Sequence, residues 1–337
     1  MTTRRRVLGR TGLSVSEIGF GCGPTADLMI NGSAQERRHA VRAALDLGID
    51  YFDTAPVYGN GVSETKLGQT LRDLGARPVL ASKVALEAGD MGDVAAAVVR
   101  SVEGSVERLG MPLTLIQLHN RVGPARAAKA EIGSGALLTV RDVLDPGGVM
   151  EAFESLRARK LVEFFGCSAY GGDMNCVAQL VDSGKFDSII ASYSLLNPSA
   201  WTAPGLQAPV RDYSRIGARA AAAGMATIAL RVLEAGVLAG ADPMQITTSP
   251  SADRLQMAAQ LPAVQQLLDE ARIPLAEAAI RFALSNDGVS LVLVGLSEPA
   301  QIAQAARCST LGPLPADLLE RIERLRGRGF AAGAPTH

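Results

Sequence analysis

The chain has 337 residues, of which 47% are hydrophobic and only 4% aromatic, and its formal net charge is −1. A chain of this length and composition can bury a large core of small and branched side chains. The small net charge leaves no basic field for a phosphate backbone, which argues against nucleic acid as a partner. No run approaches the roughly 18 apolar residues of a membrane span, so no membrane partner is expected.

The cysteines and the N-terminal residues indicate in which cellular compartment the protein is expected. The four cysteines show neither metal-like spacing nor a dense disulfide framework, which predicts reduced thiols in a cytoplasmic protein. They are Cys22, Cys167, Cys176 and Cys308. Residues 3–6 faintly resemble a twin-arginine export signal, but Arg10, Ser14 and Glu17 interrupt the apolar stretch that such a signal requires. The export interpretation is therefore rejected.

Short apolar runs alternate with helical patterns along the chain, an order typical of a parallel sheet wrapped by helices. The expected strands cover residues 16–20, 49–53, 79–83, 113–119, 163–168, 188–193, 227–231 and 289–294. A doubly wound open sheet shares this alternation, but the GFGCGP segment after the first strand lacks the GxGxxG pattern of such folds. The sequence therefore predicts an α/β fold, a (β/α)₈ TIM barrel, with residues 1–337 in a single domain.

Helix starts are readable between these strands. Ser33 and Glu36 form a capping-box pattern. Asp93 begins an Ala/Val-rich helix that ends near Gly110. Pro274 precedes the LAEAAIRFALS segment, and proline is favoured where a helix begins.

Two predicted loops are long. Residues 120–148 follow the fourth strand, and residues 194–210 follow the sixth and contain Trp201, the only tryptophan. Because βα loops lie over the C-terminal face of a barrel and long loops are uncommon unless functional, we expect both to enclose substrate. Asn120 and Trp201 are the candidate substrate residues, and for Trp201 the alternative is that it packs its loop onto the barrel. Residues 327–337 are expected to form a flexible tail.

Four chemically complementary side chains stand at or just beyond the ends of three successive strands. Asp53 ends GIDYFD, Lys83 ends VLASK and His119 ends LTLIQLH. Tyr58 follows Asp53 by five residues. Because parallel strands of a barrel end at one rim, we expect the four side chains to share a pocket. A phenol whose pKa is lowered by an ammonium is a proton donor, which predicts carbonyl reduction or alcohol oxidation.

Each member also has a structural interpretation. An aspartate at a strand end often caps a turn, and Tyr58 could stack on its own loop. A lysine in a strand fit for burial must pair with an anion or carry chemistry, and Asp53 is the obvious anion. His119 is one of only three histidines, a scarcity that argues against a zinc-dependent hydrolase. No metal is therefore expected.

These segments resemble the aldo-keto reductase superfamily, including its bacterial aldose-dehydrogenase-like branch. The resemblance is carried by GRTGLSVSEIGFGCG, GIDYFDTAPVYG, SETKLGQTL, ASK, LHN, GVLAG and VLVGLSEPAQI, which are spread over most of the chain. It implies a barrel that binds NADP or NAD without a Rossmann fold. It also implies hydride transfer between nicotinamide and an aldehyde, ketone, sugar or secondary alcohol, with Tyr58 as general acid/base beside Lys83.

The resemblance also implies cofactor contacts. The positions are Gly21, Cys22, Ser168, Leu230, Arg231, Gly236, Leu238, Gly295, Ser297 and Gln301. Three family residues that hold or stack on nicotinamide are replaced, by Ala169, Ile190 and Leu230. Residues 295–302 lack the lysine and arginine that commonly bind the 2′-phosphate of NADP. NAD is therefore considered as the cofactor beside NADP.

Two function classes follow from the resemblance. The favoured one is an NAD(P)-dependent oxidoreductase acting on a small-molecule carbonyl or alcohol. The alternative is a nucleotide-sensing, non-catalytic interaction subunit similar to potassium-channel β-subunits. The intact tetrad favours the enzyme. A third interpretation, a barrel that kept the tetrad without activity, is disfavoured because a buried lysine is costly to retain without a role.

Overall fold

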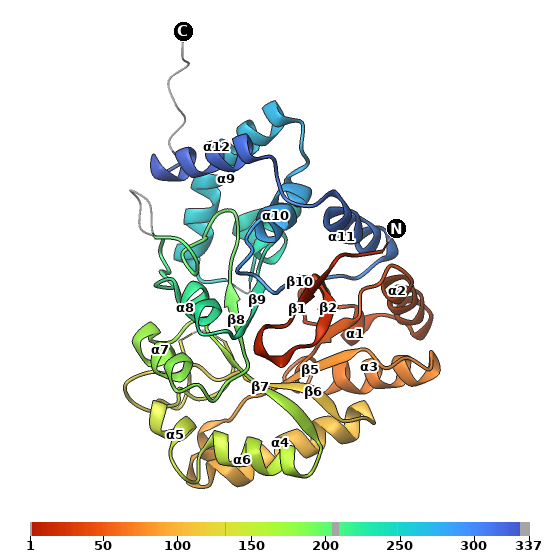
Figure 1. The fold of residues 1–337 in the computed structure, drawn as a ribbon, viewed down its shortest axis with the longest axis vertical. Coiled ribbons are helices and arrows are strands. Elements are labelled where there is room, and N and C mark those ends of the chain that lie inside the picture. Colours follow the sequence, from red (N-terminus) through yellow and green to blue (C-terminus); the bar gives the residue numbers. More distant parts are fainter. Residues whose placement is uncertain (1, 132, 204–208, 248, 331–337) are drawn as a thin grey trace.

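Eight parallel strands close into a barrel in the computed structural model, in the order β10-β3-β4-β5-β6-β7-β8-β9 (Figure 1). The structure describes residues 2–131, 133–203, 209–247 and 249–330. The barrel strands are β3 (Ile18–Gly21), β4 (Tyr51–Asp53), β5 (Val79–Val84), β6 (Leu113–Leu118), β7 (Val162–Ser168), β8 (Ser188–Ser192), β9 (Ala226–Leu230) and β10 (Leu291–Gly295). The predicted TIM barrel is confirmed, and every predicted strand lies at its expected place in the chain.

Helices surround the barrel (Figure 1). They are α1 (Leu28–Asn31), α2 (Ala34–Asp46), α3 (Val62–Asp73), α4 (Val94–Leu109), α5 (Val140–Leu144), α6 (Val149–Ala158), α7 (Met174–Asp182), α8 (Ile216–Ala222), α9 (Ser251–Ala271), α10 (Leu275–Leu284), α11 (Pro299–Leu311) and α12 (Ala316–Gly327). Short 3₁₀ turns add η1 (Gly9–Thr11), η2 (Ala88–Gly92), η3 (Glu234–Ala239) and η4 (Pro243–Gln245). Within the described ranges, no helix is both long and apolar enough to span a bilayer.

The three predicted helix starts are confirmed by their hydrogen bonds and positions. The Glu36 amide donates to Ser33 Oγ at 3.2 Å, while the Ser33 amide donates to the Glu36 carboxylate at 2.8 Å. The Asp93 carboxylate accepts from the Ala96 amide at 3.0 Å. Pro274 immediately precedes α10. These caps satisfy amides that have no partner inside the helix.

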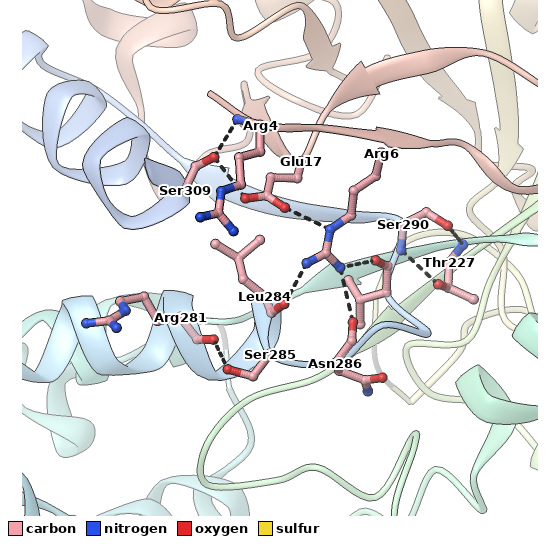
Figure 2. Close-up of polar contacts among 11 residues, drawn as sticks. Arg4, Arg6, Glu17, Thr227, Arg281, Leu284, Ser285, Asn286, Ser290 and Ser309 are labelled. Carbon is pink, nitrogen blue, oxygen red and sulfur yellow. Dashed lines mark hydrogen bonds and ion pairs between the residues drawn. The ribbon is translucent and has the colours of Figure 1, made fainter. Parts of the chain in front are cut away.

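An N-terminal hairpin, which the sequence analysis did not predict, joins β1 (Arg5–Val7) to β2 (Ser14–Ser16). Figure 2 shows how Arg6 holds this hairpin against the end of α10. Its guanidinium donates to the carbonyl oxygens of Leu284 at 2.6 Å and Asn286 at 3.1 Å, and to the Glu17 carboxylate at 2.8 Å. The arginines of the rejected export motif thus belong to the folded domain.

The predicted long connections are only partly irregular. Residues 120–148 contain α5, and residues 204–208 of the second loop lie outside the described residues. The prediction of a flexible tail is wrong for residues 327–330, because Gly327 ends α12 and Phe330 is buried in a cluster with Leu318 and Ile322. Residues 331–337 lie outside the described residues.

Candidate active site

The barrel brings the four predicted tetrad residues together at the carboxyl ends of its strands. Asp53 is the last residue of β4, Lys83 lies near the end of β5 and His119 follows β6. Lys83 forms an ion pair with Asp53, and its Nζ atom lies 5.0 Å from the centroid of the Tyr58 ring. The rings of Tyr58 and His119 meet edge to face with centroids 6.2 Å apart. The four side chains therefore lie close together, as the sequence predicts.

The Lys83–Asp53 pair is completed by groups from both neighbouring strand ends. Lys83 Nζ also donates to the Thr54 carbonyl at 2.8 Å. Gln117, which pairs with Lys83 across β5 and β6, donates from Nε2 to Asp53 at 2.9 Å. The sequence analysis missed Gln117, although a glutamine inside the apolar run LTLIQL was a usable signal. These bonds satisfy an ion pair whose side chains are both 3% exposed.

The environment decides the protonation of the tetrad. Burial raises the pKa of the Tyr58 phenol, and the Lys83 ammonium opposes that rise without reversing it. The predicted direction of the Lys83 effect holds, but the prediction of a net lowered Tyr58 pKa is wrong. Burial lowers the pKa of Lys83, yet the Asp53 charge outweighs burial and the net pKa is raised. Tyr58 is consequently protonated and Lys83 charged at neutral pH.

His119 is held neutral. Burial lowers its pKa well below 6.5, and the positive charges of Lys83 and Arg121 act in the same direction. Its Nδ1 atom is buried and has no hydrogen-bond partner in the described part of the chain. A neutral imidazole in this position can donate one hydrogen bond to a ligand oxygen.

A cavity of about 340 Å³ opens beside the tetrad and is of the size expected for a ligand site. Asp53 and Tyr58 are part of its lining. Seven of the ten predicted cofactor residues also line it, namely Gly21, Leu230, Arg231, Gly236, Gly295, Ser297 and Gln301. A cavity of about 470 Å³ lies against the N-terminal hairpin, where Arg6 and Glu17 line it, and it contains none of the tetrad.

Three predicted cofactor residues do not line this cavity. Cys22 and Leu238 are buried at 2% and 0% exposure, and Leu238, a residue of η3, belongs to the buried cluster of Leu195 and Met257. Ser168 is 4% exposed and its Oγ accepts weakly from Arg121 at 3.4 Å. If Cys22 contacts the cofactor, it would therefore do so through its backbone. The Ser168 hydroxyl, at the end of β7, has the Arg121 guanidinium as its polar neighbour.

The loop after β9 is strained where it borders the cavity. Arg231, Glu234 and Ala235 adopt positive φ values of 57°, 46° and 56°. Such values are unfavourable for residues with a side chain and cluster at functional sites. Arg231 stabilises the turn by pairing with Glu234 at 3.3 Å and by donating to Ser249 at 2.6 Å.

The two predicted substrate residues have structural surroundings. Asn120 is fully buried, and its amide bonds the backbone of Leu86 at 2.7 and 2.8 Å and the Ala136 carbonyl at 2.9 Å. Trp201 is 7% exposed and packs against Tyr193, with ring centroids 4.6 Å apart and ring planes tilted by 53°. Neither residue lines the cavity. These contacts favour loop packing for both, which was the alternative interpretation of Trp201.

The residues that line the cavity fit a dinucleotide in three respects. Glycines at positions 21, 23, 236 and 295 leave room for close approach, and a Cβ on Gly23 would lie 3.6 Å from the Tyr58 ring. Ser297 and Gln301 supply polar groups, and they bond each other at 2.9 Å. The Tyr58 phenol lines the same cavity and places a proton donor on its tetrad side.

Comparisons with known proteins agree with this geometry. A model of the Aldo/keto reductase family matches residues 17–326. A pyridoxal 4-dehydrogenase from Microbacterium luteolum is 28% identical over 338 residues, which cover 90% of this chain and 92% of that protein. A D-threo-aldose 1-dehydrogenase from a Pseudomonas species is 26% identical over 366 residues, with 97% and 98% covered.

A solved structure shares the fold. It is an aldo/keto reductase from Klebsiella pneumoniae in complex with NADP and acetate, with a TM-score of 0.68, 20% identity and 96% of each chain covered. At this identity the likeness shows the common barrel alone. Since the family model extends over nearly the whole chain, the protein belongs to the aldo/keto reductase family and is an NAD(P)-dependent oxidoreductase.

Proposed function

We propose that the protein interconverts a carbonyl compound and the corresponding alcohol, with Tyr58 as the general acid and base. The observation that carries this proposal is the position of the Tyr58 phenol, which lines the cavity with Lys83 Nζ 5.0 Å from its ring centroid. A bound nicotinamide supplies the hydride in reduction and accepts it in oxidation. The substrate class is an aldehyde, ketone, sugar or secondary alcohol.

Each tetrad residue has a separate task. In reduction Tyr58 donates its proton to the oxygen that becomes the alcohol, and in oxidation its phenolate accepts that proton. Lys83 stabilises the phenolate by its charge, and Asp53 keeps Lys83 charged and in place. Neutral His119 donates a hydrogen bond to the substrate oxygen, which stabilises the negative charge that develops there.

The family resemblance assigns the cofactor contacts, and the lining of the cavity supports four of them. Gly21 and Gly236 would face the diphosphate, and Ser297 and Gln301 would contact the adenosine end. Ser168 would bond the nicotinamide carboxamide. No lysine or arginine lies in residues 295–302, so we propose that the protein binds NAD nearly as well as NADP.

Turnover distinguishes this proposal from a nucleotide-sensing subunit. The purified protein should consume NADPH or NADH with an aldehyde and ketone panel, and reduce NADP or NAD with sugars and secondary alcohols, as followed by absorbance. Cofactor binding without turnover of any compound in either direction would reject the proposed chemistry and favour the sensing role.

A further inference from the structure

The Asp53 carboxylate accepts one side-chain hydrogen bond on each of its oxygens. Lys83 donates to Oδ1, and Gln117 Nε2 donates to Oδ2 at 2.9 Å. All three residues are buried, and Gln117 is 0% exposed. Because a carboxylate is an acceptor only, the amide nitrogen of Gln117 must face it, which fixes the orientation of the amide. Asp53 is therefore held from both sides.

The neighbouring strand leaves room for this glutamine inside the barrel. Gln117 is paired with Lys83 across β5 and β6 and with Gly166 across β6 and β7. A Cβ on Gly166 would lie 2.9 Å from Cγ of Gln117 and 2.4 Å from Ser188 Oγ. These distances are too short for a carbon atom, so a side chain at position 166 would require Gln117 to shift. With glycine there, the amide can turn toward Asp53.

Stability alone is a poor reason for an amide at this position. Gln117 interrupts the apolar run LTLIQL, where another leucine would bury no polar atom. Burying an amide costs free energy, and one hydrogen bond offsets that cost only in part. The specific consequence of the glutamine is therefore its effect on Asp53.

The position of Asp53 determines the position of the Lys83 charge. An ammonium has three N–H donors. Lys83 uses one on Asp53 and one on the Thr54 carbonyl at 2.8 Å, and its Nζ atom lies 5.0 Å from the centroid of the Tyr58 ring. The third donor is left for the Tyr58 side. A rotation of the Asp53 carboxylate would carry the ammonium with it, so a group that fixes Asp53 also fixes the charge beside Tyr58.

Several titratable or charged groups face Tyr58 from the surrounding strand ends and loops. They are Cys22, Asp53, Lys83, His119 and Arg121. Burial raises the pKa of the Cys22 thiol and lowers that of His119, so both groups are neutral at pH 7. Among the groups that stay charged, Gln117 bonds Asp53 directly and acts through it on Lys83.

We infer that Gln117 is a positioning residue of the tetrad, which acts through Asp53 to hold the Lys83 ammonium beside Tyr58. The inference rests on the proposed function and adds one residue to its machinery. The donor at Oδ2 prevents the carboxylate from rotating and offsets part of its negative charge. Without this donor, a less fixed ammonium and a stronger Asp53 charge both raise the pKa of Tyr58.

Gln117→Met removes the donor and keeps the length of the side chain. Turnover in reduction should fall about tenfold, the lower end of what one hydrogen bond to a charged group contributes. KM and cofactor affinity should stay nearly unchanged, because Gln117 does not line the cavity. The basic limb of kcat/KM should move to higher pH, in the direction of Lys83→Met but less far. Wild-type turnover with an unmoved basic limb would overturn the inference.

Two further variants show whether the effect passes through the tetrad. Gln260→Met makes the same change at a buried glutamine of α9, which is not bonded to Asp53 or Lys83 in the described part of the chain, and should leave the basic limb in place. In the background of Asp53→Asn with Lys83→Met, Gln117→Met should add no shift, since both groups through which it acts are gone. A full shift in that background would reject the assignment.

Gln117→Glu tests the donor at nearly constant shape. Two adjacent carboxyl groups share one proton, so the neutral glutamic acid can donate to Asp53 in place of the amide. Tyr51 also faces Asp53, but burial raises its pKa well above 10 and keeps it neutral. The variant should keep most of the wild-type turnover until the shared proton dissociates, which creates a basic limb below that of wild type. Gln117→Met should be impaired at every pH, and identical profiles for the two variants would contradict the inference.

A spectroscopic measurement separates this inference from the proposed chemistry. The ¹³Cζ resonance of Tyr58, assigned by its absence in Tyr58→Phe, reports on the charges next to the phenol. It should shift in Gln117→Met in the same direction as in Lys83→Met, and should not shift in Gln260→Met. If no carbonyl or alcohol is turned over but this shift is present, the proposed chemistry fails and the positioning role stands. If substrates are turned over and neither the resonance nor the pH profile changes, the reverse holds.

Discussion

Lys83 Nζ lies 5.0 Å from the centroid of the Tyr58 ring while it is ion-paired with Asp53 and bonded to the Thr54 carbonyl. The ammonium is thereby fixed beside the phenol instead of being free to rotate into solvent. Burial alone would make the Tyr58 phenolate inaccessible, and Lys83 partly offsets this effect. The pair places a fixed positive charge where a phenolate would form.

Tyr58→Phe removes the transferable proton and keeps the ring. Turnover should fall at least about a hundredfold, because general acid catalysis contributes roughly that factor or more. Cofactor affinity, measured by fluorescence titration, should remain nearly unchanged. Wild-type turnover in the variant would show that another group supplies the proton.

Lys83→Met should shift the pH profile. Reduction requires protonated Tyr58, so kcat/KM for reduction falls as pH rises through the Tyr58 pKa, which is already above 10. Loss of the ammonium raises that pKa further and moves the basic limb to higher pH. Lys83→Arg keeps the charge with altered geometry and should move it less.

A double variant is the control for this experiment. Lys83→Met leaves Asp53 buried and unpaired, which should lower the free energy of unfolding by about 3–5 kcal/mol. Asp53→Asn with Lys83→Met removes both charges and should recover part of that stability in urea denaturation. A basic limb that stays in place in both variants would mean that Lys83 does not tune Tyr58.

The cofactor preference should be weak. NADP should bind less than about a hundredfold more tightly than NAD, because two missing charge-assisted contacts of roughly 1.5–3 kcal/mol each erase a typical preference. The exposed Glu298→Lys should raise affinity for NADPH and leave that for NADH nearly constant. Titration of both reduced cofactors by fluorescence measures this, and a thousandfold preference for NADP would reveal a clamp from another element, such as Arg307.

His119 should make the protein less stable in mild acid. The unfolded chain binds a proton at His119 below its ordinary pKa of 6.5, whereas the folded protein keeps it neutral to much lower pH. The stability associated with neutral His119 is therefore complete above about pH 6.5 and is lost as the pH falls below it. From pH 7 to pH 5, wild type should lose up to about 2 kcal/mol more unfolding free energy than His119→Asn. Equal losses in urea denaturation at both pH values would contradict this.

Arg6→Met should affect stability without affecting catalysis. It removes bonds to Glu17 and to the carbonyl oxygens at the end of α10, so the free energy of unfolding should fall by about 2–4 kcal/mol. Arg5→Met breaks the solvent-accessible pair with Asp50 and the exposed hydrogen bonds to Ser14, and it should cost less than about 1 kcal/mol. Reduced kcat in folded Arg6→Met would show that the two ends of the barrel are coupled.

The sequence alone determined the barrel, its strands and the meeting of the tetrad. Strand periodicity and caps such as Ser33 with Glu36 are local patterns, so they are readable without tertiary contacts. The tetrad follows from one further rule, since parallel strands of a closed barrel end at a common rim. Asp53, Lys83 and His119 needed only their positions at those ends to be placed together.

Only the tertiary structure decided which side chains have partners. Asn120 bonds the backbone of Leu86, Trp201 packs against Tyr193 and Gln117 donates to Asp53. The first and last of these contacts join residues far apart in sequence, so the local pattern does not show them. The net rise of the Tyr58 pKa has the same origin. The burial of a side chain and its hydrogen-bond or ion-pair partners depend on all the residues packed around it. They are therefore known only from the folded structure.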